Sequence, residues 1–230
     1  NAGFAQFYRF TAADAALPQF KSRAISFVIA GGVIAAFAGP ELAKGTHDLI
    51  EGTDFLGSYL ILGGLGVVGM ALVTALKIPA PSAEERGDSG RPLSEIVRQP
   101  SLVIAILVGM IAYGTMILLM TATPLAMIGN GFHIDDASFV IQWHMVAMFA
   151  PAFFTGSIIH RFGVDKVMVT GTVLLGLAIT AALSGDQIIH FWVALFTLGL
   201  GWNFAFIGAS TLLTETYQPS EKGKVQALND

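Results

Sequence analysis

The chain has 230 residues, of which 54% are hydrophobic and only 12% are charged, and its mean hydropathy is +0.68. Soluble domains carry roughly 25% charged residues, so this composition excludes an ordinary soluble domain and indicates an integral membrane protein. The net charge of −4 says little, because the distribution of charge matters more than its sum in a membrane protein. Cysteine is absent, which excludes disulfides and thiolate metal sites within the chain. The first residue is Asn1 rather than Met, and we interpret the sequence as an internal fragment of a longer protein.

Two uncharged stretches occupy the first third of the chain. A helix needs about 20 apolar residues to cross a bilayer core about 30 Å thick. We therefore predict spans over about residues 24–43 and 55–76, both rich in the small residues that let membrane helices approach closely. Gly39 and Pro40, near the end of the first span, are candidate positions for a helix bend.

A polar segment over residues 77–100 separates these spans from the rest, and its first part is expected to be a flexible linker. Pro124 is expected to end or kink the span that follows, and Pro151 to bend the next one. The expected fold is an all-α integral membrane protein, a bundle with six spans. Its first part, residues 1–76, is followed by the linker and then by residues 101–230, with spans over about 101–123, 137–159, 167–183 and 188–213.

The basic residues follow this topology. Of the 12 Lys and Arg residues, only Lys44 falls on one side of the predicted bundle, and the other 11 fall on the opposite side. By the positive-inside rule the basic side is cytoplasmic. We expect a multi-pass protein of the cell membrane (inner or plasma membrane) with cytoplasmic segments at residues 1–23, 77–100, 160–166 and 214–230.

The short basic turn between the fourth and fifth predicted spans resembles a motif of the major facilitator superfamily (MFS). These transporters carry a cytoplasmic loop of the form Gly-x-x-x-Asp-Arg-x-Gly-Arg-Arg after helix 2, with a weaker copy after helix 8. Gly156, Arg161, Gly163 and Lys166 match its spacing. His160 stands where the family prefers Asp, and Val164 and Asp165 stand where the first basic residues would be. The turn therefore resembles the second copy, and the six spans resemble helices 5 to 10 of a twelve-helix transporter.

The resemblance implies alternating access, in which two six-helix bundles rock around a central site near the bilayer midplane. The expected function is secondary active transport of a small organic solute, coupled to protons, with the missing helices of the same transporter as partners. No catalytic or metal motif is recognised, and we expect no enzyme activity, no cofactor and no nucleic-acid partner. The alternative is a non-transporting membrane sensor or assembly protein that retains the fold.

The gating candidates are the four residues that match the motif. Arg161 and Lys166 are expected to latch one conformational state by pairing with helix ends or acidic groups, the alternative being that they only fix the topology. Gly156 and Gly163 suit a close helix approach and a tight turn.

Candidates for the substrate or proton pathway lie within the spans. His144 is ionisable inside a span and titrates near neutral pH, although it could instead bond to a neighbouring helix. Gln142 lies two residues before it. Tyr113 shares a helical face with Met116 and suits an adaptable wall for an organic substrate, with core packing as the alternative.

The last span carries a polar face. Asn203 lies there with Gly199, Ser210 and Thr214, an arrangement that suits either a water-lined cavity or interhelical hydrogen bonds. Trp202 lies beside Asn203, too deep for an interfacial belt, so we expect it either to pack in the core or to stack on a ligand.

Overall fold

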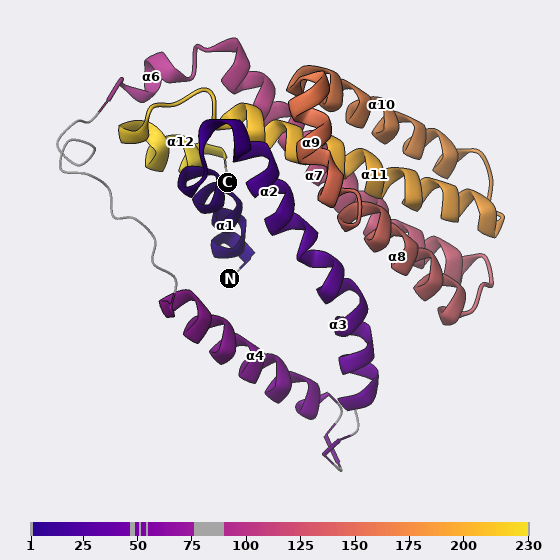
Figure 1. Ribbon diagram of the computed structural model, residues 1–230. Helices are drawn as coiled ribbons and strands as arrows, with labels where there is room; N and C mark the ends of the chain where they lie inside the picture. The colour runs from indigo at the N-terminus through magenta and orange to yellow at the C-terminus, as the bar shows by residue number, and fades with distance from the viewer. Residues whose placement is uncertain (1, 47–48, 51, 54, 76–89, 230) are drawn as a thin grey trace. The chain divides into compact units, whose positions relative to one another are not determined.

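The computed structural model describes residues 2–46, 49–50, 52–53, 55–75 and 90–229, and every regular element in these ranges is helical (Figure 1). Residues 77–89 of the predicted linker lie outside the described residues. The elements in chain order are α1 (Ala2–Ala15), η1 (Pro18–Phe20), α2 (Lys21–Ala30), α3 (Gly32–Thr46), α4 (Leu56–Ala75), α6 (Leu93–Ile96), α7 (Pro100–Gly129), α8 (Ile134–Phe149), α9 (Ala152–Phe162), α10 (Val164–Leu183), α11 (Ile188–Leu213), η2 (Pro219–Glu221) and α12 (Lys222–Asn229). Within the described residues, five helices are long and apolar enough to cross a membrane, or six if the bent pair α8 and α9 is one span. The predicted all-helical membrane fold is confirmed.

The chain divides into two compact units. The smaller unit, Ile34–Pro81, contains most of α3 and all of α4. Its two helices meet at the end of α3, where the hydroxyl oxygens of Thr46 and Ser58 lie 2.9 Å apart in a hydrogen bond. Gly57 permits this approach, because a Cβ there would lie 2.6 Å from the carbonyl oxygen of Thr46.

The larger unit, Asn1–Val33 and Ser82–Asp230, is organised around α11. This helix packs against α2, α7, α8, α9 and α10, and its second half is almost entirely buried. A helix that is apolar on every side belongs in the centre of a bundle. The contact with α10 is close, since a Cβ on Gly171 would lie 2.4 Å from the backbone nitrogen of Ala205.

The four segments that the sequence assigns to the basic side meet at one end of this unit, which we call the basic end. Lys21, His160 and Glu215 line a common cleft of about 410 Å³. Gln99 Nε2 donates a hydrogen bond of 3.1 Å to the carbonyl oxygen of Thr216. Segments before α2, before α7, between α9 and α10, and after α11 therefore lie together, as expected for helices that alternate in direction.

Helix α1 reaches further than the sequence indicated. The sequence indicates a cytoplasmic segment over residues 1–23, but a helix covers Ala2–Ala15 of it. Arg9, Phe10 and Ala13 are buried on one side of it, whereas Asp14 is exposed. The helical spacing of the buried residues, rather than the local charge, determines the structure.

Helices continue through two of the prolines, including Pro124, where the sequence predicted an end or a kink. Helix α3 passes through Gly39 and Pro40, and α7 passes through Pro124 and ends only at Gly129. Proline is tolerated inside membrane helices, because neighbouring groups satisfy the backbone carbonyls that it leaves without a donor. Pro151 behaves differently: α8 ends at Phe149, and α9 starts at Ala152 with a bend of 40° between them.

Candidate functional site

A cavity of about 280 Å³ lies within the larger unit, halfway along α7. Its volume is close to the lower end of the range of about 300–1,000 Å³ that ligand pockets span. Its walls come from α1, α2, α7, α8 and α11, together with the first residue of α3. The lining residues are Arg9, Val28, Ile29, Gly32, Tyr113, Met116, Met148, Phe149, Trp202 and Phe206.

Four of the ten described lining residues are aromatic. Trp202 stacks on Phe206, with ring centroids 4.6 Å apart and planes 15° apart. Phe149 meets Trp202 edge-on at 6.3 Å, and Tyr113 lies 6.1 Å from Phe206 in a tilted arrangement. Offset and edge-on contacts of this kind are favourable between aromatic rings and fix the positions of these side chains in the cavity wall. Of the predicted pathway residues, Tyr113 and Trp202 are thus brought together here, and their role in transport stays a prediction.

One cation contacts this aromatic group. Arg9 is only 4% exposed, and its Cζ lies 4.5 Å from the ring centroid of Phe206 and 4.4 Å from that of Phe10. Such distances allow cation–π attraction, which offsets part of the cost of burying the charge. None of the lining residues in the part of the chain that the structure describes is acidic. Arg9 belongs to the segment 1–23 that is expected to be cytoplasmic, and the helical spacing of Phe10 and Ala13 is the signal that places it on a buried helix face.

Asn203 bonds to both halves of the bent pair α8 and α9. Pro151 has no N–H, so the backbone ladder is interrupted at this point. The Nδ2 of Asn203 donates to the carbonyl oxygen of Met148 at 2.8 Å, and its Oδ1 accepts from the hydroxyl of Thr155 at 2.6 Å. Because a carbonyl oxygen only accepts, this network also fixes the orientation of the amide. Asn203 is fully buried and is not among the residues that line the cavity.

His144 is fully buried where α8 crosses α11. Its Nδ1 lies 2.8 Å from the carbonyl oxygen of Leu195, so Nδ1 carries the proton of a neutral imidazole. Its Nε2 is buried without a hydrogen-bond partner among the described residues. Gln142 is exposed and does not approach the cavity. The bond from His144 to Leu195 joins α8 to α11, which is the alternative that the sequence left open. Proton coupling by His144 remains a prediction.

The turn between α9 and α10 lies at the basic end. Gly156 is buried against α2, since a Cβ there would lie 2.7 Å from the Cα of Arg23. Gly163 has a φ of 92° and a ψ of 151°, a conformation essentially restricted to glycine. The side chains of Arg161 and Lys166 are exposed, and their predicted latching role is not tested by the structure.

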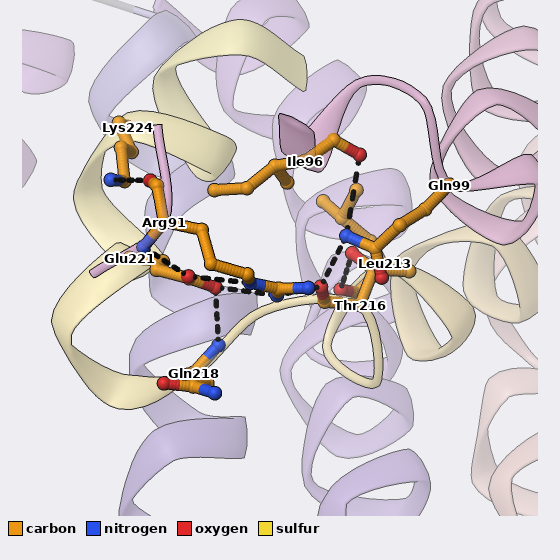
Figure 2. Close-up of polar contacts among 8 residues, drawn as sticks. All are labelled: Arg91, Ile96, Gln99, Leu213, Thr216, Gln218, Glu221 and Lys224. Atoms are coloured by element: carbon orange, nitrogen blue, oxygen red, sulfur yellow. Dashed lines mark hydrogen bonds and ion pairs between the residues drawn. The ribbon is translucent and has the colours of Figure 1, made fainter. Parts of the chain in front are cut away.

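A second polar cluster at the basic end joins the residues before α7 to those after α11 (Figure 2). The carboxylate of Glu221 is fully buried and accepts three hydrogen bonds from Arg91: from the backbone N (2.8 Å), Nε (2.8 Å) and Nη2 (2.7 Å). The backbone N of Gln218 donates a fourth at 3.0 Å. Lys224 Nζ donates to the carbonyl oxygen of Arg91.

Hydrogen bonds from Arg91 hold the pKa of Glu221 down at about 2, although burial alone would raise it. Gly90 is required beside this pair, because a Cβ there would lie 2.5 Å from the Cγ of Glu221. Sequence reasoning named neither Arg91 nor Glu221 as a candidate, since the two residues are 130 positions apart in the chain.

The bundle and its central cavity define a multi-span helical membrane protein. The chain belongs to the Major Facilitator Superfamily, whose family model matches residues 9–229. The predicted family is thereby confirmed, as is the assignment to a family of transporters rather than of enzymes.

The chain spans little more than half the length of the curated relatives that it matches. The chain is 44% identical over 231 residues to the riboflavin transporter RfnT of Brucella anthropi, a match that covers all of this chain and 58% of the relative. It is 28% identical to the uncharacterized MFS-type transporter YdeG and 23% identical to YddS, both of Bacillus subtilis. Each of these two matches covers 96% of this chain and 55% of the relative. No solved structure matches the chain.

The Arg91–Glu221 pair leads to a prediction about stability. We expect Glu221→Gln to lower the melting temperature of the full-length protein by several degrees at pH 7, because it removes a buried, fully bonded carboxylate. The folded-state pKa of about 2 lies below the ordinary value of 4.5, so this contribution is fully present above pH 4.5. It is lost as the pH falls towards 2, and the difference between variant and wild type should shrink accordingly in thermal melts.

Arg98→Gln is the matched control, because Arg98 is exposed and precedes α7, as Arg91 does. If Glu221→Gln melted like this control at pH 7, the described cluster would be wrong.

Proposed function

We propose that the full-length protein containing this chain is a secondary transporter of riboflavin, or of a solute with a closely similar planar ring. The observation that carries the proposal is the aromatic cavity, in a chain 44% identical to a riboflavin transporter. The ring system of riboflavin is flat and aromatic, and the stacked pair Trp202 and Phe206 offers it a matching surface.

Transport is proposed to follow alternating access, with the basic end on the cytoplasmic side of the cell membrane. The close contact of Gly156 with α2 supports this, because it closes the space between the two helices at that end. The Oγ of Ser22 donates to the carbonyl oxygen of Gly156 at 3.1 Å in the same place. Opening towards the cytoplasm then requires α2 and α9 to separate here.

Coupling to protons is proposed to involve His144. Its Nε2 is buried and has no hydrogen-bond partner among the described residues, and protonation of this atom would place a charge within the bundle. Met148, one helical turn further along α8, lines the cavity. Protonation of His144 is therefore proposed to affect the cavity wall through α8.

A counterflow experiment tests the substrate. Proteoliposomes containing the full-length protein are loaded with unlabelled riboflavin, and labelled riboflavin is added outside. We expect transient accumulation of label that requires no proton gradient, because exchange depends only on the substrate. Net transport in the same vesicles should stop when an uncoupler removes the gradient, and His144→Gln should uncouple it while keeping exchange. Binding without any exchange would contradict transport, and net transport that ignores the uncoupler would contradict coupling alone.

A second prediction concerns the contact at Gly156. Gly156→Val should prevent α2 and α9 from closing, and should reduce net riboflavin transport at least tenfold, because its side chain would overlap the backbone of α2. A cysteine placed at position 22 should become more accessible to thiol reagents in this variant, in a chain with no cysteine of its own. Gly176→Val is the control, since a Cβ on Gly176 meets no described atom within 4 Å. Equal transport by the two variants would rule out the proposed closure.

A further inference from the structure

Among the described residues that line the cavity, Arg9 is the charged one. Arg9 is only 4% exposed, and its other cavity neighbours are aromatic, aliphatic or thioether side chains and a glycine. Burying a charge is costly unless it gains compensating interactions. The rings of Phe10 and Phe206 supply part of that compensation through cation–π contact. Arg9 is thus a charged hydrogen-bond donor in the wall of a ligand-sized cavity, which makes it a candidate for recognising a substrate.

The chemistry of the walls limits what Arg9 can recognise. A guanidinium is planar and carries five N–H donors, so it pairs best with acceptor atoms arranged along an edge. The rings of Trp202 and Phe206 stack beside it, and the buried indole N–H of Trp202 has no acceptor among the described residues. The described residues of the site thus combine flat aromatic surfaces with donors, and none of them is acidic. A flat ring with carbonyl acceptors at one edge is complementary to this combination.

We propose that Arg9 is a specificity-determining residue that donates hydrogen bonds to the carbonyl-bearing edge of a neutral planar heteroaromatic substrate. This inference rests on the proposed function, in which the cavity holds a flavin-type ring. In riboflavin that edge is the pyrimidinedione, whose two carbonyl oxygens both accept. Riboflavin itself carries no charge, so Arg9 would bind it through charge-assisted hydrogen bonds rather than through an ion pair.

Binding of two ring compounds by the purified full-length protein tests the proposal. Lumichrome has the carbonyl-bearing ring of riboflavin without its side chain, and phenazine is a flat tricycle without carbonyls. We expect Arg9→Gln to weaken lumichrome binding by about 10- to 100-fold, as for the loss of hydrogen bonds to a charged group. Phenazine binding should stay within about twofold, because stacking does not need the donor. Arg98→Gln is the exposed control and should change neither.

The comparison of the two compounds separates recognition from structural damage, because a collapsed cavity would lose affinity for lumichrome and phenazine equally. An equal loss of affinity for both compounds would overturn the proposal. If Arg9→Gln does not yield folded protein, Arg9→Lys replaces it, and should lose lumichrome affinity but not phenazine affinity because an ammonium lacks the planar fork. Preferential, Arg9-dependent binding of the phosphorylated flavin FMN would also overturn the proposal, because Arg9 would then recognise an anion.

The two proposals fail in different ways. If riboflavin is not exchanged by proteoliposomes but lumichrome binding depends on Arg9, the riboflavin proposal fails and the role of Arg9 stands. If riboflavin is exchanged and Arg9→Gln binds lumichrome like the wild type, only the role of Arg9 is overturned.

Discussion

The larger unit depends on how the interruption at Pro151 is satisfied. A helix broken within an apolar bundle leaves backbone carbonyls without donors, and each costs free energy when it is buried. Asn203, from the central helix α11, donates to the carbonyl oxygen of Met148 and accepts from Thr155 beyond the break. A single buried amide therefore holds α8, α9 and α11 together and allows the bend of 40°.

This bend determines where the proposed functional groups lie. Before the break, α8 places Met148 and Phe149 at the cavity, against Trp202 on α11. After the break, α9 runs to the basic end, where Gly156 contacts the backbone of α2. The cavity and the proposed cytoplasmic closure are thus two ends of one bent element, and a change at either end could be transmitted through it.

The sequence predicted the fold well, because uncharged stretches and the distribution of basic residues depend on the bilayer rather than on tertiary contacts. Helical spacing also placed Tyr113 and Trp202 on spans, and both line the cavity. Arg9 was not predicted to line a cavity, because its charge and the charges that follow it marked residues 1–23 as a cytoplasmic segment. The pairing of Arg91 with Glu221 depends on contacts between distant segments, which spacing alone does not reveal. The effect of each proline on its helix could not be predicted for the same reason. Contacts with neighbouring helices decide whether the helix continues, as at Pro124, or breaks, as at Pro151.

Replacing Asn203 by leucine, which has a similar size but no polar atoms, tests the central claim most directly. The buried carbonyl of Met148 would lose its donor, and unfolding of the full-length protein should become easier by about 1–3 kcal/mol. Thr155→Val, which removes one of the two bonds at the break, should have a smaller effect. Riboflavin counterflow should fall with the leucine variant, because Phe149 and Gly156 would no longer be held in place together. A leucine variant as stable and as active as the wild type would contradict the account.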